Sequence, residues 1–204
     1  FILNSINSIN PVDVAAFRRP GAEIKEGLIP VNMFYVSQSL TENLSAEAFY
    51  QLEWDQTVVD NCGTFFAQFD SVADGCDGNL NVLTPALAPF GNALGYQTTS
   101  EGVIVPRGGD RDARDDGQWG LALRYTFEPL DTEFGAYAMN YHSRTPIFSA
   151  SAASQAEYLE SLDVLLGNVA GVPGGVPGIA IANVAGSSQY FLEYPEDIRL
   201  YGLS

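Results

Sequence analysis

The clearest pattern in the chain is an alternation of apolar and polar residues with a period of two. From Leu44 to Asp55 every even position carries an apolar side chain, and every odd position except Phe49 carries a polar one. A β-strand separates this pattern onto two faces, because successive side chains point to opposite sides of the backbone. The pattern therefore predicts a strand with one apolar and one polar face.

Two later stretches, Trp119–Phe127 and Gly135–Arg144, show the same alternation. In the first stretch the odd positions are large and apolar, and Arg124 lies on the other face. In the second stretch we expect one apolar face and one polar face, with Gly135, Tyr137, Met139 and Tyr141 on the first and Asn140, His142 and Arg144 on the second.

Residues 28–40 and 189–204 supply the remaining candidates, which gives about five strands in all. Both faces of the stretch 28–40 are similarly apolar, so the pattern assigns neither of them. In the last stretch Pro195 must lie at an edge, at a bulge or at the start of the strand, because proline has no amide hydrogen to donate.

The connections between these strands alternate between short and long. Residues 41–43 and 128–131 are short enough for tight turns, whereas residues 56–118 and 145–187 are long. Bacterial outer-membrane barrels show the same asymmetry, with short periplasmic turns and long outer loops, and their strands need about 9 to 11 residues to cross the bilayer. We therefore expect an all-β fold, an antiparallel up-and-down transmembrane β-barrel fragment in the bacterial outer membrane.

The expected segments follow one another within a single domain, 1–204. They are a loop (1–27), a hairpin (28–57), a long acidic outer loop (58–117), a second hairpin (118–144), a long outer loop with a helix (145–187) and a final strand (188–204). The helix is predicted by a capping box, Ser154 with Glu157, which precedes apolar residues at helical spacing. The Gly-Val-Pro-Gly repeat within 171–178 is expected to end it as a loop tip, or to fold into the lumen as a constriction.

Five strands are too few to close the smallest common barrel, which has about eight. An open sheet in lipid would leave the backbone groups of its edges unpaired. The chain also opens without an initiating Met or a signal peptide. We therefore expect it to be a piece of a longer polypeptide, with a subunit of a composite barrel as the alternative.

The alternation also predicts which side chains meet lipid and which line the lumen. Aromatic residues gather at the membrane interfaces of outer-membrane barrels, and the lumen of a barrel is polar. The expected girdle consists of Trp54, Trp119, Tyr125, Tyr137 and Tyr141, with Tyr125 and Tyr137 in contact across two strands. The expected lumen-facing residues are Glu47, Gln51, Glu53, Arg124, Asn140, His142 and Arg144.

Composition narrows the class further. The chain carries 25 acidic and nine basic residues, for a net charge of -16, yet 46% of it is hydrophobic, so we expect order. No basic stripe is present that could neutralise phosphates, which argues against nucleic-acid binding. The two cysteines, Cys62 and Cys76, flank a stretch rich in Gly and Asp and favour a disulfide in an oxidising compartment over two free thiols.

Five long stretches resemble an uncharacterised family of Gram-negative proteins, the domain of unknown function 1302. They are Asn10–Glu23, Lys25–Met33, Ala48–Trp54, Asp60–Phe66 and Glu193–Gly202. The resemblance implies an outer-membrane β-barrel, often encoded beside a periplasmic lipoprotein-like partner and an RND-type exporter, which suggests traffic in lipidic or hydrophobic compounds. It supplies no catalytic residues and no cofactor.

One histidine and one acidic stretch are candidates for a catalytic site and a metal site. His142 could serve a Ser-His-Asp hydrolase, but no Gly-x-Ser-x-Gly motif is present, so a residue lining the pore or its rim is the plainer interpretation. The carboxylates Asp110, Asp112, Asp115 and Asp116 have the ligand type of a calcium loop, although their spacing differs from that of an EF-hand and Arg111 and Arg114 lie among them.

Three functions remain on these observations. The first is a channel or transport barrel in the lipid bilayer for small hydrophobic molecules, without catalytic activity. The second is an outer-membrane hydrolase that uses His142. The third is a soluble secreted β-sandwich that binds a partner, in which the apolar faces would form a protein core.

Overall fold

The computed structural model describes residues 9–82, 84–167 and 177–204. The chain forms two compact units, which are described separately. The first comprises Phe1–Val59, Arg111–Ile147 and Glu193–Ser204, and the second comprises Asp60–Asp110 and Phe148–Leu192. The fold is mostly β with antiparallel sheets and a few helices, which confirms this part of the predicted fold class.

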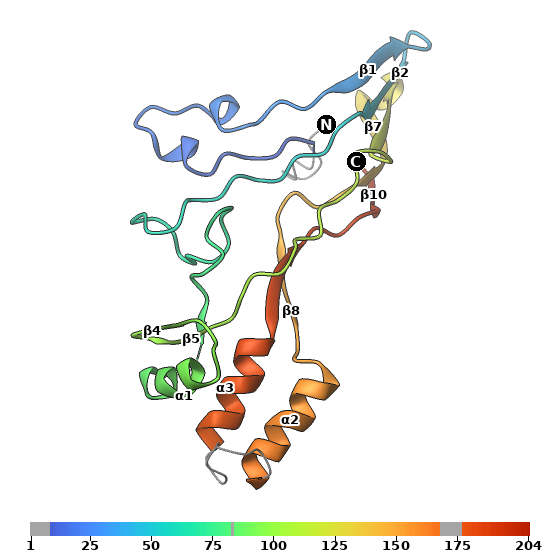
Figure 1. Ribbon diagram of the computed structural model, residues 1–204. Coiled ribbons are helices and arrows are strands. Elements are labelled where there is room, and N and C mark those ends of the chain that lie inside the picture. The colour runs from blue at the N-terminus through green and yellow to red at the C-terminus, as the bar shows by residue number, and fades with distance from the viewer. Residues whose placement is uncertain (1–8, 83, 168–176) are drawn as a thin grey trace. The chain divides into compact units, whose positions relative to one another are not determined.

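The first unit is built on a five-stranded antiparallel sheet (Figure 1). Its strands are β1 (Met33–Ser39), β2 (Leu44–Gln51), β6 (Trp119–Phe127), β7 (Thr132–Tyr141) and β10 (Ile198–Leu203), in the spatial order β1-β2-β6-β7-β10. Every strand of this sheet therefore lies beside the strand of the same sheet that follows it along the chain. This is the up-and-down order that the sequence predicts.

Two tight turns close the hairpins of this sheet. In the first, the amides of Leu40 and Thr41 both donate to the carbonyl of Leu44, and the Thr41 hydroxyl accepts from the amides of Asn43 and Leu44. In the second, the short helix η4 (Glu128–Leu130) ends at Asp131, whose φ of 46° lies in the left-handed region. Aspartate tolerates this conformation better than most residues, which suits it to the turn.

The segment before β1 is less regular than the sequence suggests. It holds the short helices η1 (Ala16–Arg18) and η2 (Ile24–Glu26), and Val12 forms a single bridge to Leu28. The expected strand start near residue 28 is wrong, because the strand begins at Met33. Pro30 explains the difference, since it has no amide hydrogen for a strand ladder.

The second unit contains elements where long loops are expected. A small sheet has the order β3-β5-β4, formed by β3 (Asn81–Val82), β4 (Thr98–Thr99) and β5 (Gly102–Ile104). A two-stranded sheet pairs β8 (Ile147–Ser151) with β9 (Gln189–Glu193). Pro195 follows β9 and precedes β10, so it interrupts neither strand.

The helices of this unit are η3 (Pro85–Leu87), α1 (Ala88–Ala93), α2 (Gln155–Leu166) and α3 (Pro177–Ser187) (Figure 1). The predicted capping box of α2 is confirmed, since the Ser154 hydroxyl accepts from the Glu157 amide and the Glu157 carboxylate accepts from the Ser154 amide. The expectation of one helix is wrong, because α1 and α3 also form. The loop predicted at 171–178 lies outside the described residues up to 176, and its last two residues begin α3. None of the described helices is both long and apolar enough to cross a membrane.

Candidate functional site

The register of the five-stranded sheet separates two chemically different faces. Residues that pair directly across an antiparallel sheet share a face. On one face, here called the apolar face, Arg199 is charged and Leu44 and Phe127 are half-buried, but all five strands carry exposed large apolar side chains. They are Phe34, Val36, Tyr50, Trp119, Leu121, Leu123, Tyr125, Phe134, Tyr201 and Leu203.

The other face, here called the ion-pair face, carries Glu47 and Arg124. Arg124 Nη1 donates to Glu47 Oε1 at 2.7 Å across the β2–β6 pair. Tyr137 is hydrogen-bonded to the same guanidinium group and to the Ser204 side chain. The polar chain therefore runs across β2, β6, β7 and the end of β10. Phe49 and Met139 also lie on this face, so it combines charged and apolar side chains.

This register corrects the expected faces of β7. Tyr137 pairs with Ala122 and therefore lies on the ion-pair face, away from Tyr125, so the expected contact between the two tyrosines is wrong. Tyr141 has the same parity as Tyr137 and lies on the ion-pair face. Asn140 pairs with Trp119, so it lies on the apolar face and not among the lumen-facing residues as expected. The sequence pattern assigns the faces of β7 wrongly because its odd and its even positions both carry apolar residues. The even positions Phe134, Ala136 and Ala138 complete the apolar face, and two of these three side chains are small.

Trp54 does not lie on the apolar face with Trp119. Trp54 follows the end of β2 and is only 9% exposed, whereas Trp119 is 42% exposed. The indole of Trp54 packs edge-to-face on Tyr194, and its Nε1 donates to the carbonyl of Ser143. Trp54 is therefore part of the core of the first unit. The strand ends at Gln51 although the alternation of the sequence continues to Asp55, which is why the pattern misplaces this residue.

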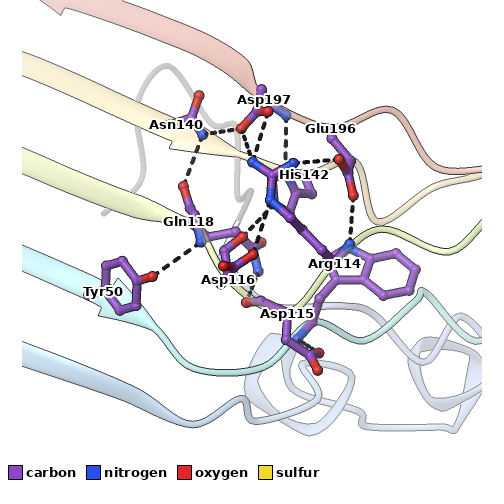
Figure 2. A network of polar contacts seen from close by, with 11 residues as sticks. Tyr50, Arg114, Asp115, Asp116, Gln118, Asn140, His142, Glu196 and Asp197 are labelled. Carbon is purple, nitrogen blue, oxygen red and sulfur yellow. Dashed lines mark hydrogen bonds and ion pairs between the residues drawn. The ribbon is translucent and has the colours of Figure 1, made fainter.

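A polar network lies where β6 begins and where β7 and β10 have their neighbouring ends (Figure 2). Arg114 is its centre. Its Nη2 donates to both oxygens of Asp197 at 2.7 and 2.8 Å, its Nη1 donates to Glu196 at 2.5 Å, and its Nε lies 3.1 Å from Asp116. Asn140 joins the network by donating to Asp197 and to the Gly117 carbonyl. The network thus connects the entry into β6 with the entry into β10.

Hydrogen bonding in this network favours the charged forms of Asp197 and Arg114. The bonds from Arg114 and Asn140 hold the pKa of Asp197 below its usual value. The hydrogen bond between Arg114 and Asp197 also raises the pKa of Arg114. Both groups are therefore charged at neutral pH, and their attraction favours the folded arrangement of the two segments.

His142 is fully buried behind this network (Figure 2). Its Nδ1 accepts a hydrogen bond from the Asp197 amide at 3.0 Å, so Nδ1 carries no proton. Its Nε2 lies 2.8 Å from the Asp116 carbonyl, which can only accept, so Nε2 carries the proton. Both ring nitrogens are engaged by the backbone. The lone pair that a catalytic base would need is already in use, which gives the hydrolase hypothesis no support at this residue.

A buried cation lies next to this network. The guanidinium group of Arg144 donates to the side chains of Gln51 and Gln118 and to the Asp55 carbonyl, and these acceptors are all uncharged. Among the described residues its Nε has no acceptor. Burial lowers the pKa of Arg144 to about 10, and Asp55 partly opposes this shift. Gln51 in turn donates to the Ile9 carbonyl, so Arg144 and Gln51 connect the sheet to the N-terminal segment.

Glu53 accounts for the last of the polar residues predicted on β2. It accepts from both the backbone amide and the side-chain amide of Asn32, at 2.9 and 3.0 Å. This contact joins the residue before β1 to the second residue after β2, so Glu53 closes the open end of this hairpin.

The four carboxylates of the calcium hypothesis do not come together. Asp110 binds Arg107, Asp115 accepts from the Trp54 amide, and Asp116 pairs with Arg114. In the part of the chain that the structure describes, no group of three metal-ligating side chains has the geometry to hold a metal ion, and Asp112 joins none. Asp110 and Asp116 are thus each paired with an arginine, Arg107 and Arg114, and are not brought together around a cation.

The predicted disulfide between Cys62 and Cys76 is confirmed. The loop that it closes carries the Ala73 carbonyl, which accepts from Arg107 Nη1 at 2.8 Å. Arg107 also forms a two-bond contact with Asp110, and these bonds raise its pKa although burial opposes them. The hydroxyl of buried Tyr190 donates to the Ser71 carbonyl of the same loop. The disulfide loop is therefore part of the core of the second unit.

Comparison with known proteins adds one finding. The model of a family described as "Protein of unknown function (DUF1302)" matches residues 1–204, the whole chain. The chain belongs to the DUF1302 family. No curated protein and no solved structure matches this DUF1302 chain.

Sequence reasoning missed the centre of the polar network in this DUF1302 chain. Arg114 appears in the sequence only as a charge that dilutes a possible calcium loop, and its partners Glu196 and Asp197 lie more than eighty positions away. The antiparallel order of the strands brings these segments together. The signal that could have found the pair is that both segments directly precede strands that enter the sheet from the same end.

Proposed function

We propose that the five-stranded sheet is part of the wall of a larger outer-membrane β-barrel, and that this barrel carries small hydrophobic molecules. The observation that carries the proposal is the apolar face. Its large side chains are exposed over all five strands, up to 72% for Tyr201 and 88% for Leu203. Contiguous apolar surface of this kind is unusual in a soluble monomer and marks contact with lipid or protein.

Removal of the apolar face from water is favourable in free energy. Full burial of one large apolar side chain contributes about 1.5–3 kcal/mol, so about ten half-exposed side chains forgo on the order of 10 kcal/mol in water. Lipid would cover all of them without any rearrangement of the strands. The alternating polar face would then point away from lipid, as it does in outer-membrane barrels.

The edges of the sheet set the next requirement. Strands β1 and β10 lie at its two edges. In hydrocarbon each unpaired backbone group costs several kcal/mol, so both edges need strands beside them. We propose that further strands of the same barrel pair with β1 and β10.

The ion-pair face supports an interior suited to apolar cargo. Glu47 and Arg124 supply charge, but Tyr35, Phe49 and Met139 share this face. The interior of a porin is mainly polar, and an interior with aromatic and thioether groups offers apolar contacts along the path. The family resemblance adds the lipoprotein-like partner and the RND-type exporter as proposed components of the same traffic.

Spin labelling of the full-length protein in outer-membrane lipid tests the barrel. Val36→Cys and Leu121→Cys place a label on the apolar face, and Ser37→Cys and Ser45→Cys place it on the ion-pair face. The native cysteines are bonded to each other and do not take up the label. We expect high collision rates with oxygen at the first pair and with a water-soluble nickel chelate at the second pair.

Two results would contradict the proposal. Low accessibility to both reagents at Val36 and Leu121 would mean that a protein layer covers the apolar face, as in a β-sandwich. Recovery of the protein from the periplasm or the medium, without heat-dependent migration on SDS gels, would also exclude the barrel.

A further inference from the structure

An open groove runs between helices α2 and α3 of the second unit. Its volume is about 350 Å³, and its lining consists of Tyr158, Ser161, Leu162, Leu165, Ala180, Ile181, Val184 and Ala185. This volume is at the lower end of the ~300–1,000 Å³ that is typical of small-molecule sites. The lining residues of α2 extend over about two turns of helix, or roughly 10 Å. The groove therefore matches a short aliphatic chain in size.

The floor of the groove is fixed by buried polar contacts. Asn183 on α3 donates to the Ser161 hydroxyl at 2.7 Å and to the Glu157 carbonyl at 3.3 Å. The hydroxyl of Tyr96 donates to the Asn183 side-chain oxygen at 2.7 Å. The Ser161 hydroxyl itself donates to the Glu157 carbonyl. These bonds set the spacing of the two helices, and they leave Ser161 without a donor for a ligand.

The remaining lining is almost entirely apolar. Leucine, isoleucine, valine and alanine side chains form the walls, and Tyr158 supplies a hydroxyl group at one end. Tyr158, Ile181 and Leu162 are all more than one third exposed, so a ligand can reach them from solvent or from lipid. A ligand in this groove would gain apolar contacts and at most one hydrogen bond from a side chain of the lining.

The surrounding charges select against anions. Residues 145–198 contain no lysine or arginine, whereas α2 carries Glu157, Glu160 and Asp163. A carboxylate or phosphate head group at this groove would find no cation on either helix and would feel the negative charge of α2, which disfavours its binding. An uncharged head group carries no such penalty. The charge pattern therefore separates neutral aliphatic molecules from fatty acids of the same length.

We propose that the α2–α3 groove is a binding site for uncharged aliphatic molecules such as medium-chain alcohols. The inference rests on the proposed function for its biological meaning, because it names the class of hydrophobic molecule that the barrel would carry. Binding itself depends only on the second unit. The two proposals can therefore fail separately.

Photoaffinity labelling of the full-length protein in nanodiscs tests the site directly. The probes are decanol and decanoate that carry the same alkyl diazirine, and mass spectrometry maps the labelled peptides. We expect the alcohol to label α2 and α3, and the decanoate to label them about tenfold less because its charge is repelled. Equal labelling by both probes would overturn the charge selection, and labelling confined to the sheet would overturn the site.

Two groove variants and a matched control keep the test specific. Leu162→Glu introduces a charge into the groove, and Ala185→Leu fills the groove without a charge. Leu159→Glu introduces the same charge on α2 at an exposed position outside the lining. We expect both groove variants to lose most of the labelling and the control to keep it. Equal loss in the Leu159→Glu control would overturn the site.

The spin-label experiment on the sheet separates the two proposals. Lipid exposure of the apolar face without labelling of the groove would refute the groove alone. Labelling of the groove in a protein whose apolar face is covered by protein would refute the barrel alone. Displacement of the alcohol probe by a basic amphipathic peptide, with no displacement by unlabelled decanol, would assign the groove to a protein partner and would overturn the proposal.

Discussion

The ring of Phe49 on β2 lies against the backbone of Gly120, the residue with which it pairs on β6. A Cβ atom at position 120 would collide with three atoms of this ring. The pair explains the one exception in the alternation of β2. Phe49 is an apolar residue on the ion-pair face, and the missing side chain of Gly120 gives its ring a place in which it is almost fully buried.

Substitution of Gly120 by alanine should therefore destabilise the sheet. We expect Gly120→Ala to lower the free energy of unfolding by about 1–3 kcal/mol, because the added methyl group displaces the ring. Urea unfolding in detergent measures the change. Gly78→Ala is the control, since a Cβ atom there meets nothing within 4 Å. The double variant Phe49→Leu/Gly120→Ala should lose less than the sum of its single changes, and full additivity would contradict the contact.

The Glu47–Arg124 ion pair should couple β2 to β6 more strongly than an exposed pair does. The side chain of Glu47 is only 18% exposed. In a double-mutant cycle with Glu47→Gln and Arg124→Met we expect a coupling energy of about 1–3 kcal/mol. The control cycle uses Arg111 and Glu193, whose side chains are 63% and 40% exposed, and we expect less than about 1 kcal/mol there. Equal coupling in both cycles would show that burial adds nothing.

Replacement of His142 should act on stability and leave no catalytic signature. His142→Ala leaves the Asp197 amide and the Asp116 carbonyl without their partner, and we expect a loss of about 2–4 kcal/mol in the free energy of unfolding. Thermal unfolding measures this loss, and hydrolysis of a p-nitrophenyl ester measures activity. Esterase activity of the native protein that disappears in a folded His142→Ala variant would support the hydrolase hypothesis instead.

Acid should weaken the network around Arg114 through Asp197. The pKa of Asp197 in the folded protein lies below the unfolded value of about 3.9. A carboxylate with a lowered pKa stabilises the fold above that unfolded value, and the contribution is lost as the pH falls through the folded pKa. We expect Asp197→Asn to reduce stability at pH 7 and to flatten the decline below about pH 4. Unfolding measured from pH 2 to 7 tests this expectation.

The partner of Asp197 supplies the control for that experiment. Arg114→Met removes the first cause of the lowered pKa. In an Arg114→Met background, Asp197→Asn should therefore change the pH profile much less than it does in the native protein. An unchanged effect would mean that another group sets the acid response.

Loss of the disulfide should weaken the second unit. The bond joins residues 14 positions apart, and a loop of this size contributes about 3 kcal/mol by restricting the unfolded chain. We expect Cys62→Ser/Cys76→Ser to lower the stability of this unit by that order, and hydrogen exchange at Tyr190 and Arg107 to increase. Exchange of the β6–β7 amides should change less. Equal changes in both regions would show that the two units unfold as one.

The sequence predicts the first unit well where its alternation is strong. In β2 polar residues, with the exception of Phe49, alternate with apolar ones, and in β6 small or polar residues alternate with large apolar ones, so the faces follow directly from the pattern. In β7 both parities are apolar, and only the pairing of Tyr137 with Ala122 decides the faces. The hydrogen bond between Tyr137 and Arg124 is consistent with Tyr137 on the ion-pair face, and no local sequence pattern predicts this bond.

The second unit follows less readily from sequence. Helix α3 contains Gly186 and several β-branched residues, which are poor helix formers, and tertiary packing offsets this. The missing side chain of Gly186 leaves room for the ring of Tyr96, and that of Gly178 for Leu87 and Phe90. The partners come from a segment that reads as loop, so neither the helix nor its contacts could be inferred locally.

The way in which the chain alternates between its units limits how the protein can be divided. The polypeptide passes from one unit to the other after residues 59, 110, 147 and 192. Each unit is thus assembled from separate stretches, and no single cut releases either one intact. A fragment that ends after residue 147 would keep four strands of the five-stranded sheet and lose half of the second unit, including β9 and all of β8 except Ile147. Dissection of this protein therefore requires circular permutation or replacement of both inserted stretches together.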